Sequence, residues 1–297
     1  MPEFIDSILH EKRIFFPSEE FSRKSHVKSM KEYSKIYTKS IENPEAFWAE
    51  KAGHLEWFKK WDIVLRNDMG FFKWFEGGQL NVSSNCLDGI IKSGKKDKIA
   101  YIWESESGET KTFTYEQLLK EVCKFADVLK RLGVKRGHIV EIYLPMIPEL
   151  PISMLACARI GAIHSVVFAG FSSDALKDRI QDSNAEILIT ADGSFRNGKI
   201  VSLKENADAA LEECPSIKNA IVVGRTKNKI EMKYGRDLWW HELMVDAGDS
   251  CEPESMHSEE SLFILYTSGT TGKPKGILHT QAGYLLFVQQ KIGRAHV

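Results

Sequence analysis

The residues best suited to chemistry lie between positions 267 and 276, directly after the apolar run Leu262–Tyr266. They read Thr-Ser-Gly-Thr-Thr-Gly-Lys-Pro-Lys-Gly. The three glycines let the backbone approach a ligand closely, the four hydroxyls can donate hydrogen bonds, and the two lysines carry positive charge. A polyphosphate requires these groups, so the segment predicts a nucleoside triphosphate site behind a buried strand.

The spacing within this segment differs from the P-loop pattern G-x-x-x-x-G-K-[ST], because two residues separate Gly269 from Gly272 and Pro274 follows Lys273. A glycine-rich surface turn is the alternative. Hydroxyls, glycines and lysines interleaved behind a buried strand favour phosphate binding instead. The candidate phosphate-binding residues are Thr267, Ser268, Gly269, Thr270, Thr271, Gly272, Lys273, Lys275 and Gly276.

A second basic segment follows the predicted strand Glu186–Thr190. There Arg196 and Lys199 flank an Asn-Gly turn formed by Asn197 and Gly198. The planar guanidinium of an arginine can form paired hydrogen bonds with a phosphate. An ordinary exposed basic pair is the alternative, but the place of the segment at the carboxyl end of a strand favours a ligand.

The elements that must position these residues alternate between short apolar runs and amphipathic segments from about residue 99, beginning with the run Ile99–Trp103. The predicted strands are Ile139–Leu144, Ile163–Phe168, Glu186–Thr190 and Ala220–Val223, and the predicted helices are Tyr115–Leu132, Glu149–Ile160, Ser173–Gln181, Ile200–Glu213 and Gln281–Gln290. This pattern predicts an α/β fold with a doubly wound parallel sheet. Ligands bind outside the carboxyl ends of such strands, which singles out the loops after Phe168 and Thr190.

The organisation of the chain is predicted from shifts in composition. Residues 1–90 form an aromatic-rich N-terminal extension, in which Trp57 and Trp61 are expected on one face of a helix that packs against the main body. Residues 91–250 form a first α/β subdomain, and the polar stretch 244–257 resembles a linker. Residues 251–291 then begin a second α/β subdomain, whose sheet we expect to be truncated.

Composition excludes several classes of protein. The 297 residues include 40 Lys and Arg against 41 Asp and Glu, so no overall charge would attract nucleic acid or a membrane. The patterns G-x-S-x-G, H-E-x-x-H and G-x-G-x-x-G are absent. The N-terminus lacks the pattern of a secretory signal, and the cysteines lack zinc-ligand spacing, so we expect a cytoplasmic protein with free thiols and no metal site of its own. The cysteines are Cys86, Cys123, Cys157, Cys214 and Cys251.

The glycine-rich segment resembles the signature loop of adenylate-forming enzymes, which include acyl-CoA synthetases, luciferases and the adenylation domains of peptide synthetases. Four further stretches resemble the acetyl-CoA synthetases among them, and the resemblance runs from about residue 20 to residue 290. These stretches are Trp74–Asn81, Asn85–Asp88, Pro145–Phe171 and Gly235–Leu243. The chain departs from the family where Gly89-Ile90 replaces a usual Arg-His.

The resemblance implies an AMP-forming acetate–CoA ligase. Acetate attacks the α-phosphate of Mg²⁺-bound ATP to give acetyl-adenylate and pyrophosphate, and the thiol of CoA then displaces AMP. The resemblance further implies that the glycine-rich segment orients the β- and γ-phosphates, with Lys273 and Lys275 as charge donors. The implied substrates and cofactors are acetate, ATP, Mg²⁺ and CoA, without nucleic-acid or membrane partners.

The resemblance also assigns two loops to CoA. The 3′-phosphoadenosine end is expected at Arg196, Asn197, Gly198 and Lys199, with the adenine against Phe168, Ala169 and Gly170. The family more often has arginine at Lys199 and glycine at Ala169.

The last residues, 292–297, do not resemble the family but match one reading frame of a short-read sequencing adapter, so we expect a non-native tail. In the family, the adenine- and ribose-binding segments, the acyl pocket and the mobile C-terminal domain lie downstream, so the chain is expected to be an inactive, aggregation-prone N-terminal fragment. Two alternatives remain. One is a synthetase for propionate or another short acid, and the other is a non-catalytic module that binds a nucleotide or CoA.

Overall fold

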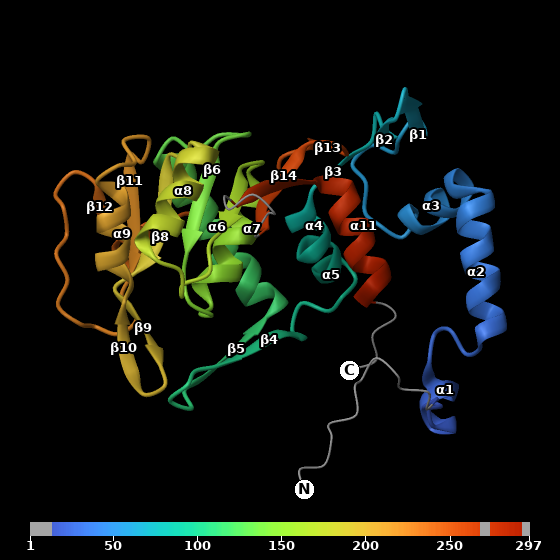
Figure 1. The fold of residues 1–297 in the computed structure, drawn as a ribbon, viewed down its shortest axis with the longest axis horizontal. Helices are drawn as coiled ribbons and strands as arrows, with labels where there is room; N and C mark the ends of the chain where they lie inside the picture. Colours follow the sequence, from blue (N-terminus) through green and yellow to red (C-terminus); the bar gives the residue numbers. More distant parts are fainter. Residues whose placement is uncertain (1–13, 268–273, 293–297) are drawn as a thin grey trace, which may run out of the picture.

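A seven-stranded sheet forms the centre of the molecule (Figure 1), in a computed structural model that describes residues 14–267 and 274–292. The strand order is β12-β11-β8-β6-β7-β14-β15, and every neighbouring pair is parallel except β14 and β15. The strands are β6 (Ile139–Tyr143), β7 (Ile163–Val166), β8 (Ile187–Ala191), β11 (Asn219–Val223), β12 (Asp237–Trp239), β14 (Ser261–Thr267) and β15 (Lys275–Thr280).

Helices connect these strands in the doubly wound arrangement that the sequence predicts. From β6 the chain crosses through α7 to β7 on one side, then returns through α8 to β8 on the other side of β6. Since parallel crossovers are right-handed, this reversal of direction places α7 and α8 on opposite faces of the sheet. The helices are α6 (Tyr115–Arg131), α7 (Glu149–Arg159), α8 (Ser173–Ser183), α9 (Leu203–Leu211), α10 (Trp240–Val245) and α11 (Gln281–Ile292).

Local sequence explains where two of these helices begin. Thr114 and Gln117 form a capping box at the start of α6, each side chain bonding the backbone N–H of the other residue. Ser172 caps α8 by accepting the N–H of Ala175. The start predicted for α8 is therefore confirmed.

The predicted helix Ile200–Glu213 is wrong in its first turn. Residues Lys199–Ser202 form β10, which pairs with β9 (Gly193–Arg196) in an antiparallel hairpin, and α9 begins only at Leu203. The turn between the two strands consists of Asn197 and Gly198, whose φ angles are 51° and 70°. Asn-Gly readily adopts such positive angles, which match the twist of a two-residue hairpin.

The apolar run Ile99–Trp103 is a strand, but it lies outside the main sheet. It forms β4 (Ile99–Glu104), which pairs with β5 (Thr110–Thr114) as a separate two-stranded hairpin. In Figure 1 this hairpin extends below the sheet toward the β9–β10 hairpin. The two hairpins together border the cleft described below.

The N-terminal region contributes short helices and strands, several of which pack against α11. They are α1 (Glu19–Lys24), α2 (Met30–Glu42), α3 (Pro44–Ala52), β1 (Ile63–Asp68), β2 (Phe71–Glu76), β3 (Gln79–Leu80), α4 (Val82–Cys86) and α5 (Asp88–Lys92), with β13 (Met256–His257) paired to β3. A buried cluster joins Phe75, Leu80 and Leu286 from this region and α11. The N-terminal elements thus share a core with the end of the described chain.

The helix predicted for Trp57 and Trp61 is wrong, because both residues lie in an irregular segment between α3 and β1. The indole of Trp57 donates a hydrogen bond to the carbonyl of Ala52 at the end of α3, and the backbone N–H of Phe58 then donates to the carbonyl of Gln79 in β3. These contacts pull the chain away from helical geometry. The packing role is confirmed, since the two indole rings lie 4.9 Å apart, centroid to centroid.

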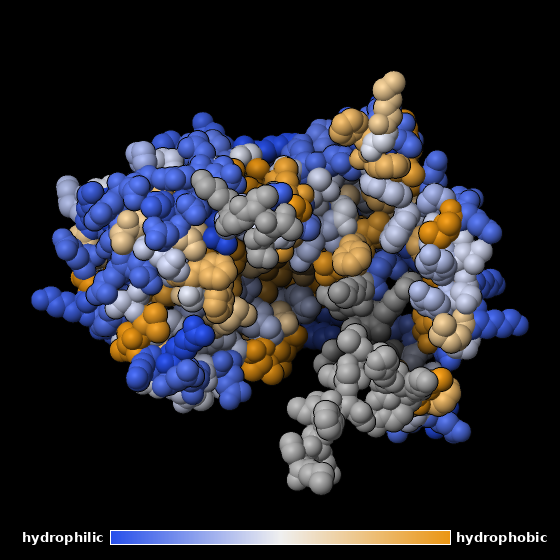
Figure 2. Space-filling model, in the orientation of Figure 1, coloured by the Kyte–Doolittle hydropathy of each residue, from blue (hydrophilic) through white to orange (hydrophobic). Residues whose placement is uncertain are grey.

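The strand expected to open a second sheet instead extends the first one. β14 pairs with β7, with Phe263 opposite His164, and the ring of Phe263 also stacks on His279 of β15 at 4.4 Å. β15 is an edge strand, and Leu265, Ile277 and Leu278 remain about half exposed, at 50%, 47% and 54%. Figure 2 shows hydrophobic side chains at the surface beside β14. The division of the chain near residue 250 stays a prediction.

In the described part of the chain, no helix is both long enough and apolar enough to cross a membrane.

Candidate functional site

A cleft of about 340 Å³ lies at the carboxyl ends of the central strands. Its walls come from the segments that follow β6, β7, β8 and β11, and from the β4–β5 hairpin. The lining residues are Trp103, Glu104, Ser105, Glu106, Pro145, Met146, Ile147, Phe168, Ala169, Gly170, Ser194, Phe195, Arg196, Val201 and Arg225. This is the edge of the sheet that the strand pattern singles out for ligands.

Four of the seven residues assigned to CoA by resemblance line this cleft: Phe168, Ala169, Gly170 and Arg196. The other three, Asn197, Gly198 and Lys199, follow Arg196 around the hairpin turn and do not line the cleft. The two predicted loops, one after β7 and one after β8, therefore meet in space.

At position 170, the side chains of two neighbouring residues occupy the space that a Cβ atom would take. A Cβ atom there would lie 2.5 Å from a ring carbon of Phe168 and 3.0 Å from Nη1 of Arg196. The absence of a side chain thus allows the aromatic ring and the guanidinium to approach the same backbone.

A buried tyrosine holds the loop that carries Phe168 and Gly170. The hydroxyl of Tyr143, at the end of β6, donates hydrogen bonds to the carbonyls of Phe171 at 2.7 Å and Ala169 at 3.3 Å. Burial raises the pKa of Tyr143, so the hydroxyl keeps its proton and remains a donor. The loop after β7 is therefore tied to the neighbouring strand.

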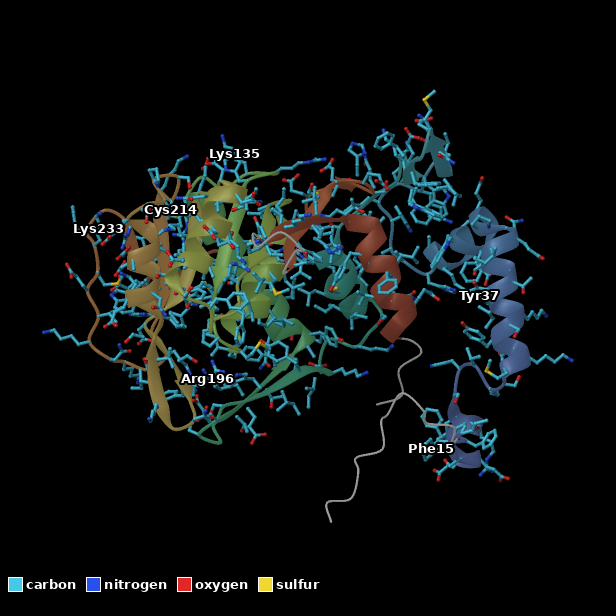
Figure 3. The ribbon with its side chains drawn as sticks, in the orientation of Figure 1. Phe15, Tyr37, Lys135, Arg196, Cys214 and Lys233 are labelled. Carbon is cyan, nitrogen blue, oxygen red and sulfur yellow. The ribbon has the colours of Figure 1, made fainter. Side chains whose placement is uncertain are left out.

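Arg196 projects between the β9–β10 and β4–β5 hairpins (Figure 3). Its side chain is exposed, and no carboxylate of the described residues lies within ion-pair distance of its guanidinium. An unpaired guanidinium at the wall of a cleft can accept an anionic ligand without first breaking an internal ion pair.

Trp103, Glu106 and Arg225 are among the residues of the cleft that were not predicted from the sequence. Trp103 donates its indole N–H to the carbonyl of Met146 at 2.7 Å, and a carboxylate oxygen of Glu106 accepts the N–H of Gly198 at 2.6 Å. Arg225 follows β11, so the rule that pointed to Arg196 applies to it as well. Trp103 and Glu106 carry no such signal, because their hairpin lies outside the sheet.

A buried carboxylate organises the segment that contains Arg225. Asp192, which is 1% exposed, accepts the backbone N–H groups of Arg225, Thr226 and Lys227 at 2.8, 2.9 and 2.7 Å, and that of Gly193 at 2.7 Å. Charge-assisted bonds of this kind are stronger than neutral ones. Asp192 therefore fixes the turn after β11 against the end of β8.

Of the candidate phosphate-binding residues, Thr267, Lys275 and Gly276 lie within the described structure. Thr267 pairs with Lys275 at the end of the β14–β15 hairpin where the chain passes from one strand to the other. The other six candidates, Ser268, Gly269, Thr270, Thr271, Gly272 and Lys273, lie outside the described residues. The hydroxyl and cation that border the glycine-rich segment are thus neighbours across two strands.

Arg179 of α8 connects the two candidate regions. Its guanidinium lies 4.9 Å from the ring centre of Phe171, in the loop after β7, and 5.3 Å from that of Tyr266 in β14. The hydroxyl of Tyr266 donates to Asp182 of the same helix at 2.7 Å. The residue that precedes the glycine-rich segment is therefore packed against α8.

The described residues hold no group of three or more His, Cys, Asp and Glu side chains that could bind a metal. All five cysteines are free thiols.

The family model of AMP-binding enzymes matches residues 92–296, more than two thirds of the chain. The chain belongs to the AMP-binding enzyme family. A second model, described as the acetyl-coenzyme A synthetase N-terminus, matches residues 33–86. The two matches together include both loops of the cleft and the glycine-rich segment, so the resemblance found in the sequence is confirmed.

Relatives within the AMP-binding enzyme family are close in sequence. The acetyl-coenzyme A synthetase of Rubrobacter xylanophilus is 54% identical over 277 residues, covering 93% of this chain and 42% of the relative. That of Chlorobaculum tepidum is 50% identical over 284 residues, covering 96% and 43%. The acetoacetyl-CoA synthetase from Streptomyces lividans has the same fold, with a TM-score of 0.84 at 23% identity, over 93% of this chain and 44% of that one. The chain spans less than half the length of each.

Proposed function

We propose that the chain is the N-terminal part of an AMP-forming acetate–CoA ligase, which converts acetate, ATP and CoA into acetyl-CoA, AMP and pyrophosphate through acetyl-adenylate. The proposal is supported by relatives named acetyl-coenzyme A synthetase, which are 54% and 50% identical to this chain over nearly its whole length. The observation that carries the proposal is the meeting of Phe168, Gly170 and Arg196 at one cleft.

The cleft suits the 3′-phosphoadenosine end of CoA. Phe168 and Gly170 offer an aromatic face beside open backbone, on which an adenine ring stacks. Arg196 binds the 3′-phosphate through paired hydrogen bonds, while Asn197, Gly198 and Lys199 extend the polar and positively charged surface beyond the cleft. The thiol end of CoA then points toward the remaining part of the enzyme.

The glycine-rich segment binds the phosphates of ATP. Thr267 and Lys275 border it with a hydroxyl and a cation, and its glycines, Gly269 and Gly272, leave the backbone free to approach the phosphate oxygens. Mg²⁺ enters with ATP and neutralises part of the phosphate charge. The residues of this chain orient the triphosphate and stabilise the departing pyrophosphate.

The test separates the two half-reactions in the complete enzyme. Arg196→Ala should raise the KM for CoA, because it removes a phosphate contact, and should leave acetate-dependent exchange between ATP and pyrophosphate nearly unchanged, because exchange needs no CoA. Equal losses in both assays would refute the assignment of the cleft.

The 297-residue chain by itself forms no acetyl-CoA under this proposal, since the relatives it matches are more than twice as long. The half-exposed Leu265, Ile277 and Leu278 make the isolated chain prone to aggregate. Expression of residues 1–297, followed by an assay for AMP formation that depends on acetate and CoA, tests this. Turnover clearly above a vector control would overturn it.

A further inference from the structure

Arg225 lies between the two hairpins that border the cleft. Its guanidinium is 4.9 Å from the ring centre of Trp103 in β4 and 5.3 Å from that of Phe195 in β9. Its Nη1 also lies 3.0 Å from a carboxylate oxygen of Glu109, in the turn of the β4–β5 hairpin. One side chain thus contacts both hairpins.

The backbone that carries this side chain is itself fixed. Asp192 accepts the N–H of Arg225 and of the two residues after it, so the guanidinium extends from a rigid turn. Trp103 is fixed as well, by its bond to the carbonyl of Met146. Phe195 lies in β9 of the β9–β10 hairpin and directly precedes Arg196.

The charges of the two arginines have different surroundings. Arg225 is 16% exposed in its side chain and is paired with Glu109, and this pairing lowers the pKa of Glu109. Arg196 has no such carboxylate partner among the described residues. The cation free to bind an anion is therefore Arg196, while Arg225 is engaged in internal contacts.

We propose that Arg225 is a positioning residue, which links Phe195 to Trp103 and thereby fixes where Arg196 meets the ligand. This inference rests on the proposed function, because it takes the cleft to be the CoA site. A guanidinium over two aromatic rings suits the role, since its charge is attracted to the π-electrons of both rings. Fixing β9 in advance reduces the ordering that ligand binding would otherwise require.

The test measures the complete enzyme with CoA as the varied substrate. Arg225→Ala should raise the KM for CoA roughly threefold to tenfold, with ATP–pyrophosphate exchange unchanged. Arg225→Lys should recover only part of the loss, because an ammonium group keeps the charge without the flat stacking surface. Lys229→Ala is the matched control, since it removes a cation from the same segment at an exposed position, and it should leave the KM unaltered.

A double-mutant cycle distinguishes positioning from direct binding. If Arg225 acts through Arg196, then Arg196→Ala with Arg225→Ala should raise the KM for CoA no further than Arg196→Ala alone. Additive effects would show that Arg225 binds the ligand independently and would overturn the proposal. Phe195→Leu gives a second route to the same result, because it removes the ring that Arg225 holds while leaving Arg225 in place.

The outcomes separate this inference from the proposed function. If Arg196→Ala leaves the KM for CoA unchanged, the CoA site itself is wrong. If Arg196→Ala raises that KM while Arg225→Ala and Phe195→Leu behave as wild type, only the positioning role is wrong. A matching loss of exchange activity in the Arg225 variants would show a general effect on folding and would also overturn it.

Discussion

The hydroxyl of Tyr143 donates a hydrogen bond to the carbonyl of Phe171, with 2.7 Å between the two oxygens. Tyr143 is fully buried at the end of β6, whereas Phe171 closes the loop after β7 that lines the cleft. The bond therefore anchors this loop to a buried strand of the sheet.

Tyr143→Phe should lower the free energy of unfolding by about 1 kcal/mol, because it leaves two loop carbonyls without their donor. It should also raise the KM for CoA, since the loop loses its fixed position. Urea unfolding and CoA titration measure the two effects. Tyr101→Phe is the control: the Tyr101 hydroxyl is buried without a hydrogen-bond partner within the described structure, so its removal should cost no stability.

Gly170→Ala should weaken CoA binding without slowing ATP–pyrophosphate exchange. The new methyl group would lie 2.5 Å from the ring of Phe168 and 3.0 Å from Arg196, so the ring of Phe168 must shift. At Gly248 a Cβ would come no closer than 3.7 Å to any neighbour, which makes Gly248→Ala the comparison. An unaltered KM for CoA in Gly170→Ala would contradict the close approach inferred at this site.

Lys275→Met should give the opposite pattern. We expect ATP–pyrophosphate exchange to fall by about tenfold or more, because a charge beside the triphosphate is lost, while the KM for CoA stays unchanged. Lys199→Met, at the hairpin turn, should instead raise the KM for CoA and spare exchange. If both lysine variants changed the same half-reaction, the assignment of the two segments to different substrates would fail.

The contribution of Glu141 to the free energy of unfolding should fall as the pH rises from about 5 to about 8. Burial raises the pKa of this carboxyl from 4.5 to about 8, although the hydroxyls of Ser165 and Ser183 and the charge of Arg179 act in the opposite direction. The folded state therefore holds a proton that the unfolded chain has already lost. The stabilisation is complete below the pKa of Glu141 in the unfolded chain, and it is lost as the pH rises through the pKa of Glu141 in the folded protein.

Glu141→Gln should remove this pH dependence, because an amide of similar shape does not titrate. Between about pH 5 and pH 8, the free energy of unfolding of the variant should therefore increase relative to that of the wild type. The increase should be roughly a few kcal/mol at most. Urea unfolding at several pH values measures it. Parallel curves for the two proteins would show that Glu141 is not the group responsible.

Much of the fold follows from local patterns. Strands such as Ile139–Tyr143 and Asn219–Val223 were predictable to within a residue or so, because a strand buried in a parallel sheet reads as a short apolar run between polar turns. The capping residues Thr114 and Ser172 mark their helices equally well. The Trp57–Trp61 spacing predicted a helix wrongly. A hydrogen bond from the indole of Trp57 to Ala52 and backbone hydrogen bonds to Gln79 outweigh the helical periodicity.

For the cleft, sequence alone predicted the residues Arg196 and Gly170 and the two loops that carry them, and the structure brings these loops together at one cleft. Arg196 and Gly170 follow strands whose carboxyl ends share one edge of the sheet, and that edge is set by the parallel connections. Only the tertiary structure decided that Arg225 lies over the rings of Trp103 and Phe195, and that Glu106 bonds to Gly198. The physical reason is that these contacts join hairpins far apart in the chain. Their geometry depends on how separate elements pack, which no local spacing encodes.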